Sequence, residues 1–112
     1  MCGILGVIDN NGVDESIFKK QLEIIDHRGP DATGVWKNDK KTIFLGSKRL
    51  SIQDLSNKGS MPMISDDKRF IIVFNGEIYN FKNVKEKLVS LGFNFFSGSD
   101  TEVVLKSYIH WG

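Results

Sequence analysis

The longest apolar runs in this chain, such as Phe70-Ile71-Ile72-Val73-Phe74, are the length of a strand. They are far too short to cross a bilayer as a helix, and they fit a strand buried in a protein core. Asn75-Gly76 follows this run directly, and Asn-Gly after an apolar segment is the strongest short-range signal for a β-hairpin. We therefore predict a strand over 69–74, a hairpin turn at Asn75-Gly76 and a return strand through Glu77-Ile78-Tyr79.

The first half of the chain predicts strands with one intervening helix. Apolar runs, helical spacing and clusters of Gly, Pro, Asn and Asp mark where each element begins and ends. The predicted elements are a buried strand over 3–9, a helix over 14–26 capped by Asp14 and ended by Gly29-Pro30, an irregular segment over 27–34, a hairpin of 35–37 and 42–47, an extended stretch over 49–52 and a loop over 54–63.

The second half predicts two helices joined by a short strand. Asn80 is placed as the N-cap of a helix that ends before Gly92, and 93–96 is predicted to be a strand. Ser99-Asp100-Thr101-Glu102 has the spacing of a capping box and opens the last helix. Hairpins mixed with helices predict an α+β fold in which antiparallel sheet predominates and helices flank it.

Size and composition exclude several classes of partner. The chain has 112 residues, which is one domain or a piece of one. Its 15 Lys+Arg and 14 Asp+Glu give a net charge of +1, so no field of one sign attracts nucleic acid or an anionic membrane. A single cysteine forms no internal disulfide and leaves no cysteine-based metal site, and we expect no secretory signal. We expect a cytoplasmic protein that binds neither nucleic acid nor membrane.

That single cysteine is Cys2. Initiator methionine is normally removed before a small second residue, and its removal leaves a thiol and a free α-amine on the same carbon. The two groups have ordinary pKa values of about 8.5 and about 7.7–8.0, so the amine can serve as the base for its own side chain. The alternative is that Cys2 is a small buried hydrophobic residue at the start of a strand.

Other polar clusters each have a chemical and a purely structural interpretation. The Asn75 amide and the Gly76 N–H are donors suited to a developing oxyanion, or the pair only forms a turn. Arg49 either pairs with a substrate carboxylate through its planar guanidinium group or is a solvated surface arginine. Asp100 accepts hydrogen bonds from a substrate ammonium, or only caps a helix. The charged loop 27–31 (His-Arg-Gly-Pro-Asp) organises a neighbouring loop, or is a solvated turn.

The order of these clusters along the chain is more specific than any one of them. Cys2-Gly3-Ile4 with Gly6, 27–31, 49–52, 74–80 and 99–102 together resemble the glutaminase domain of class II glutamine amidotransferases, whose nucleophile is an N-terminal cysteine. Within that group, the sequences Arg-Leu-Ser-Ile at 49–52 and Asn-Gly-Glu-Ile-Tyr-Asn at 75–80 resemble the asparagine synthetase branch. The resemblance spans practically the whole chain.

The resemblance implies a fold and a domain arrangement. The family fold is the four-layer αββα sandwich of N-terminal nucleophile hydrolases, and this chain is about its first half. We therefore expect residues 1–112 to be a truncated type-2 glutamine amidotransferase domain without its synthetase domain, which would act in cis or in trans. ATP and Mg are expected only in that absent domain, and no cofactor or metal in this one. An exposed sheet face or edge also favours self-association, so a homodimer is among the expected partners.

The resemblance also implies a reaction and a set of site residues. Cys2 attacks the side-chain amide of glutamine, ammonia leaves, and water converts the glutamyl thioester to glutamate, with aspartate as the default acceptor of the ammonia. Asn75 and Gly76 form the oxyanion hole. The remaining substrate contacts are Arg49 to the α-carboxylate, Glu77 and Asp100 to the α-ammonium, and the backbone of Leu50, Ser51, Ile52 and Gln53 along the pocket.

Two other functions stay open at this stage. One is a non-catalytic module that binds glutamine or a partner without turning it over. The other is a different N-terminal nucleophile amide hydrolase, which would not need both Arg49 and the acids Glu77 and Asp100.

Gln53 departs from the small apolar residue, commonly valine, that is more frequent in asparagine synthetases. If its side chain enters the pocket, we expect weaker glutamine binding.

Overall fold

The computed structural model describes residues 2–50 and 59–112. Its larger sheet is antiparallel, with the strand order β1-β3-β2. The strands are β1 (Gly3–Ile8), β2 (Ala32–Lys37) and β3 (Ile43–Arg49). The strand predicted over 3–9 and the hairpin of 35–37 with 42–47 are therefore confirmed, and Lys37 pairs with Phe44 beside the turn.

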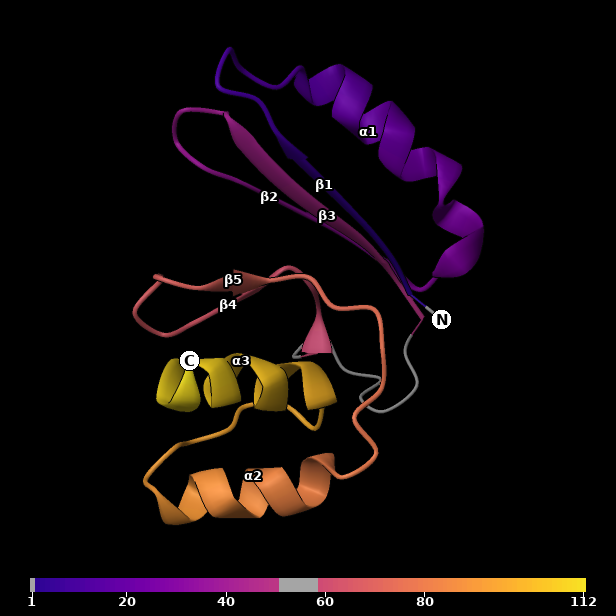
Figure 1. The fold of residues 1–112 in the computed structure, drawn as a ribbon. Helices are drawn as coiled ribbons and strands as arrows, with labels where there is room; N and C mark the ends of the chain where they lie inside the picture. Colours follow the sequence, from indigo (N-terminus) through magenta and orange to yellow (C-terminus); the bar gives the residue numbers. More distant parts are fainter. Residues whose placement is uncertain (1, 51–58) are drawn as a thin grey trace.

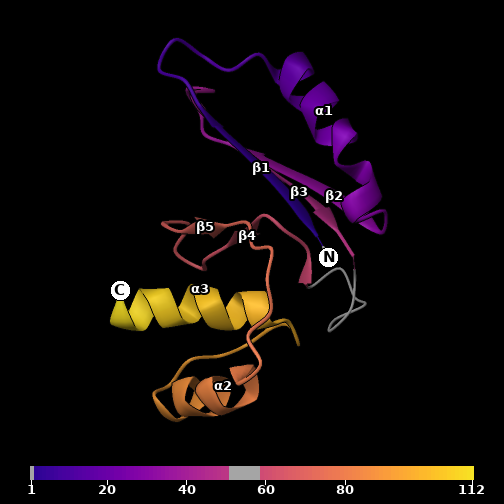
Figure 2. The same cartoon turned by 45° about the vertical axis from the view of Figure 1, so that its right-hand side comes forward.

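Three α-helices and a second, smaller sheet complete the described chain. Strands β4 (Met63–Ile64) and β5 (Ile71–Ile72) pair antiparallel. In Figures 1 and 2, helix α1 covers one face of the larger sheet, the β4-β5 pair lies on the opposite side, and α3 and then α2 follow beyond it. The protein is thus α+β, with antiparallel sheets and flanking helices, as predicted. The helix bounds are α1 (Glu15–Ile24), α2 (Phe81–Ser90) and α3 (Asp100–Trp111).

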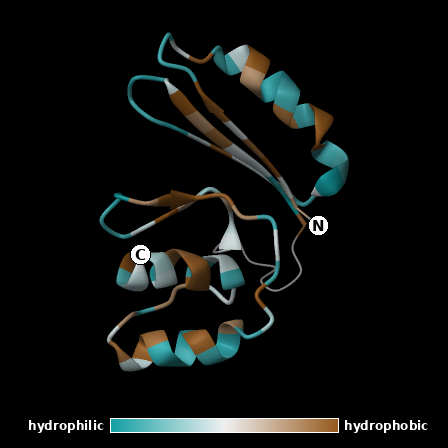
Figure 3. Cartoon of the chain, viewed as in Figure 1, coloured by the Kyte–Doolittle hydropathy of each residue, from teal (hydrophilic) through white to brown (hydrophobic). Residues whose placement is uncertain are grey.

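Helix α1 packs on the larger sheet through a small aromatic core. The side chains of Phe18, Leu22 and Phe44 are buried together, and the rings of Phe18 and Phe44 lie 5.1 Å apart. A Cβ at Gly46 would lie 3.0 Å from the Phe18 ring, so a glycine in β3 lets the helix approach closely. The predicted cap is confirmed, because the Asp14 side chain accepts a hydrogen bond from the N–H of Ile17. Figure 3 shows hydrophilic and hydrophobic residues alternating along this helix.

Met61 connects the larger sheet to the second half of the molecule. Its carbonyl oxygen accepts a hydrogen bond of 2.8 Å from the hydroxyl of Ser47 in β3. Its sulfur accepts from the N–H of Phe74 at 3.2 Å and from the hydroxyl of Thr101 in α3 at 3.9 Å. A Cβ on Gly34 would lie only 1.7 Å from the Met61 carbonyl oxygen, so β2 also packs directly on this residue.

The predicted hairpin at Asn75-Gly76 is wrong. Strand β5 covers only Ile71–Ile72 and pairs with the preceding strand β4, while no strand forms over 77–79. A type I′ turn needs positive φ at both central residues, and neither Asn75 nor Gly76 has it. The N–H groups of Phe74 and Ile78 instead donate to the Met61 sulfur and to Asp100. Side-chain acceptors from elsewhere in the chain therefore replace a strand partner.

The short strand predicted over 93–96 is also wrong. The backbone N–H groups of Phe96 and Ser97 donate to the carboxylate of Glu102 and not to another strand. The segment predicted to be irregular over 27–34 holds the end of a 3-10 helix (Asp26–Arg28) and the start of β2. The loop predicted over 54–63 ends in strand β4, and its residues 54–58, like 51–52 of the extended stretch, lie outside the described residues.

The two helices of the second half begin and end close to the predicted positions. Asn80 is the N-cap of α2, although its side chain makes no capping hydrogen bond, and Gly92 follows the helix with φ of 99°. Ser99 caps α3 by accepting from the N–H of Thr101. The Ser99 N–H does not return to Glu102 as in a capping box, because it donates to the hydroxyl of Ser97.

The contact between β2 and Met61 predicts an unequal response to two glycine substitutions. Gly34→Ala should lower the free energy of unfolding by about 1–3 kcal/mol, because the added methyl overlaps a backbone carbonyl. Gly6→Ala is the matched control on the same sheet, since its Cβ would make an ordinary 3.4 Å contact with Leu45. Urea denaturation measures both, and equal stability of the two variants would contradict the packing described here.

Candidate active site

The pairing of β1 with β3 places Cys2 beside the end of β3. Gly3 pairs with Lys48, so the residue before Gly3 lies next to Arg49 and Leu50 although 48 positions separate Cys2 from Leu50. The Leu50 N–H donates to the Cys2 sulfur at 3.4 Å, and the thiol lies 3.7 Å from the Leu50 carbonyl oxygen. Cys2 is only half-buried, so the structure does not support the alternative of a residue sealed in the core. Ser51, Ile52 and Gln53 lie outside the described residues.

The loop over 27–31 packs on the backbone that carries Arg49. A Cβ on Gly29 would lie 2.3 Å from the Lys48 carbonyl oxygen, so only glycine fits this position. The N–H of Asp31 donates to the Arg49 carbonyl at 3.0 Å. The Arg49 side chain is buried, with 7% of the residue exposed. The loop therefore organises a neighbouring segment, which is one of the two roles expected for it.

Asp100 lies against the segment that carries Asn75 and Gly76. It is the first residue of α3, is 6% exposed, and accepts a hydrogen bond of 2.9 Å from the Ile78 N–H. Asn75 is half-buried, whereas Gly76 and Glu77 are exposed. A Cβ on Gly76 would lie 3.0 Å from the ring of Phe74, so the turn is compact here. Asp100 thus fixes the segment bearing the predicted oxyanion donors.

These residues form two groups at the same end of the molecule. Figures 1 and 2 show the start of β1, the end of β3, the segment 73–80 and the start of α3 on one side. Met61 joins the groups, since it bonds to Ser47 near the end of β3, to Phe74 and to Thr101 next to Asp100. Sequence reasoning missed Met61, because a methionine within a Ser, Asn, Gly and Pro loop carries no signal of a buried contact.

The described part of the chain offers neither a metal-binding cluster nor a membrane-spanning helix. No group of three or more His, Cys, Asp or Glu side chains within 2–50 and 59–112 is arranged to hold a metal ion. Among the helices described there, none has the length and apolar character needed to cross a membrane.

Known proteins identify the family. The profile of the glutamine amidotransferase domain matches residues 1–112. The chain belongs to the glutamine amidotransferase domain family. It is 38% identical to "Asparagine synthetase [glutamine-hydrolyzing] 1" of Bacillus subtilis, and that alignment covers 99% of this chain and 18% of the relative.

Two further relatives of this glutamine amidotransferase domain carry different names. A "Putative asparagine synthetase [glutamine-hydrolyzing] 2" of Methanocaldococcus jannaschii is 41% identical over 96% of this chain and 24% of its own length. "Amidase chry2" of Gibberella zeae is 36% identical over 100% of this chain and 18% of its own length. The chain therefore spans about a fifth of the length of the relatives it matches.

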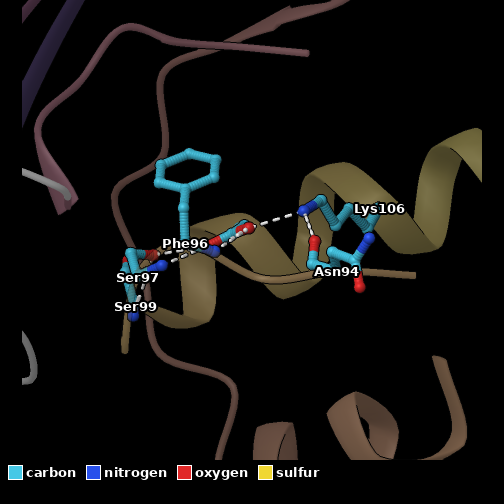
Figure 4. Close-up of polar contacts among 6 residues, drawn as sticks. Asn94, Phe96, Ser97, Ser99 and Lys106 are labelled. Atoms are coloured by element: carbon cyan, nitrogen blue, oxygen red, sulfur yellow. Dashed lines mark hydrogen bonds and ion pairs between the residues drawn. The ribbon is translucent and has the colours of Figure 1, made fainter. Parts of the chain in front are cut away.

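Glu102, two residues after Asp100 in α3, forms a buried ion pair with Lys106. Glu102 is 0% exposed, and its carboxylate accepts from Lys106 at 2.6 Å and from the Ser97 hydroxyl at 2.6 Å. Burial raises the pKa of the Glu102 carboxyl, but the hydrogen bonds from Lys106, Ser97 and the Phe96 N–H outweigh burial and hold that pKa below its ordinary value. The carboxylate is thus charged and fully bonded (Figure 4).

The lowered pKa of Glu102 predicts a stability that falls in acid. The unfolded chain takes up this proton first, so the stabilisation is complete above the ordinary pKa of about 4.3 and is lost as pH falls through the lower pKa of the folded state. Glu102→Gln should lower the free energy of unfolding by about 3–5 kcal/mol at neutral pH, because it breaks a buried ion pair. The difference in free energy of unfolding between wild type and this variant should become smaller below a pH of about 4.

Denaturation of wild type and Glu102→Gln at several pH values between neutral and acidic measures this difference in the free energy of unfolding. Lys106→Met is the companion variant, because removing the cation raises the pKa of Glu102 and should move the loss of stability to higher pH. If the difference in free energy of unfolding between wild type and Glu102→Gln stays constant with pH, the charge of Glu102 does not stabilise the fold.

Proposed function

We propose that this domain hydrolyses the side-chain amide of glutamine, with Cys2 as the nucleophile, and supplies the ammonia to an amide-forming synthetase domain. The match of the whole chain to the glutamine amidotransferase domain supports the reaction. The single observation that carries the assignment of the nucleophile is the half-buried Cys2, whose sulfur lies beside the Leu50 backbone at the end of β3.

The proposed reaction begins after Met1 has been removed. The free α-amine of Cys2 takes the thiol proton, and the sulfur attacks the amide carbon of glutamine. The Asn75 amide and the Gly76 N–H stabilise the oxyanion of the tetrahedral intermediate. The C–N bond then breaks, the amine returns its proton to the departing ammonia, and a glutamyl thioester remains. Water attacks that thioester, which releases glutamate and restores the thiol.

Substrate recognition is proposed to use one cation and two carboxylates. Arg49 pairs with the α-carboxylate of glutamine, while Asp100 and Glu77 hold the α-ammonium. The burial of Arg49 and Asp100 supports this, because a site built from fixed polar groups strongly rejects analogues that cannot hydrogen-bond to them. The backbone of 50–53 is proposed to line the same pocket.

The domain is proposed to be the N-terminal portion of an αββα sandwich of the N-terminal nucleophile hydrolase type. The order of α1, the larger sheet, the β4-β5 pair and α3 supports this proposal (Figure 1). The synthetase domain is proposed to follow in cis or to act in trans, and to bind ATP and Mg. Aspartate is the default acceptor of the ammonia, since relatives are named glutamine-hydrolyzing asparagine synthetases.

The two alternatives receive less support. A non-catalytic module would not need a cysteine sulfur beside the end of β3, and two of the relatives described above are named for glutamine hydrolysis. A different N-terminal nucleophile amide hydrolase would not need a buried cation at Arg49 together with a buried carboxylate at Asp100. Glutamine hydrolysis accounts for both charges.

Glutamate release from glutamine by the full-length gene product tests the proposal. Cys2→Ala should abolish it, and Asn75→Ala should lower kcat by about 10²–10³ because one oxyanion donor is lost. Asn80→Ala is the matched control, since Asn80 lies on the same segment and its side chain makes no capping hydrogen bond. If Asn75→Ala loses no more activity than Asn80→Ala, Asn75 does not stabilise the oxyanion.

A further inference from the structure

We propose that the buried pair Glu102–Lys106 is a positioning device that fixes Asp100 for recognition of the substrate α-ammonium. The proposal rests on the function proposed above, because it assumes that Asp100 binds that ammonium. Glu102 and Lys106 do not touch the substrate, so they act through Asp100 and set the selectivity of the site for an amino acid over its deaminated analogue.

The first step is that the pair ties the loop before α3 to the helix itself. The Glu102 carboxylate accepts the N–H of Phe96 at 3.0 Å, the N–H of Ser97 at 2.8 Å and the hydroxyl of Ser97 at 2.6 Å. Lys106, one helical turn further on, bonds to Glu102 and to the carbonyl oxygen of Asn94. Both ends of the segment 94–97 are therefore attached to α3 (Figure 4).

The second step leads from this loop to Asp100. The Ser97 hydroxyl accepts the N–H of Ser99 at 3.3 Å, and the Ser99 hydroxyl accepts the N–H of Thr101 at 3.1 Å. Asp100 lies between these two bonded residues, so the backbone on each side of it is held. Its carboxylate then accepts the Ile78 N–H at 2.9 Å, immediately after Glu77, the other carboxylate assigned to the ammonium.

The third step explains why charged residues occupy positions 102 and 106. A buried ion pair adds little net stability, and apolar residues of similar volume often replace one without loss. A carboxylate differs from an apolar side chain in accepting several hydrogen bonds at once, so Glu102 can fix two backbone N–H groups and a hydroxyl together. The Lys106 ammonium also lies 4.6 Å from the centre of the Phe95 ring, which holds it in place.

The consequence is a specific effect on the substrate. A shift of about 1 Å in a positioning group costs about 10² in rate. Displacing Asp100 harms substrates that carry an α-ammonium more than those that lack it, because glutaramate, which is glutamine without its α-amino group, offers Asp100 nothing to bind. Any disturbance of the Asn75 segment through the Ile78–Asp100 hydrogen bond acts on both substrates and cancels in their ratio. A general loss of folded protein would lower the hydrolysis of both compounds by the same factor.

The test is the ratio of kcat/KM for glutamine to kcat/KM for glutaramate in the full-length gene product. Glu102→Gln and Lys106→Met should each lower this ratio at least about tenfold, because a hydrogen bond to a charged group is lost from the support of Asp100. Lys106→Arg keeps the charge and should keep the ratio within about threefold of wild type. Glu86→Gln, on the exposed side of α2, is the matched control and should leave both substrates unaffected.

Each outcome decides the proposal. Equal losses on both substrates in Glu102→Gln, or an unchanged ratio, would overturn it. If Glu102→Gln does not fold, the comparison of Lys106→Met with Lys106→Arg decides in the same way. Asp100→Asn separates this proposal from the proposed function: if that variant keeps the ratio, or if wild type does not hydrolyse glutamine, the assignment of Asp100 itself is wrong.

Discussion

The contacts of Met61 hold the two halves of this domain together. Its carbonyl is bonded to Ser47 in β3, and its sulfur accepts hydrogen bonds from Phe74 and Thr101. The absence of a side chain at Gly34 lets this residue lie directly against β2. One half carries Cys2, and the other half carries the Asn75 segment with Asp100. The proposed site takes its nucleophile from one half and its oxyanion donors from the other, so it depends on this junction.

Elements set by local signals were predicted well from the sequence, and elements set by distant acceptors were not. The caps at Asp14 and Ser99 act within a few residues of their own helices, so sequence spacing reveals them. The hairpin at Asn75-Gly76 had a strong local signal and was still wrong. The Ile78 N–H bonds to Asp100, 22 positions away, and no local pattern contains that acceptor. The 93–96 strand was wrong because the Phe93 N–H donates to the Leu88 carbonyl at the end of α2 and the Phe96 N–H donates to the Glu102 carboxylate.

The candidate site shows the same division. The chemistry of each side chain, together with the order of the motifs, named Cys2, Arg49, Asn75 and Asp100 as candidates. The structure adds that Cys2 lies beside Leu50 and that Asp100 is bonded to the Asn75 segment. The supporting residues could not be predicted in this way. Glu102 was predicted to complete a capping box, whereas its bonds go to the loop before the helix, and Met61 had no signal at all.

The central claim is that Cys2, freed of Met1, is the nucleophile of a pocket shaped for glutamine. Its most direct test is peptide mass spectrometry after treating the full-length gene product with a diazo-ketone analogue of glutamine. The account predicts an N-terminal peptide that begins at Cys2, carries one label on the sulfur, and is protected from labelling by excess glutamine. A retained Met1 with an unlabelled Cys2, or labelling that glutamine does not slow, would contradict it.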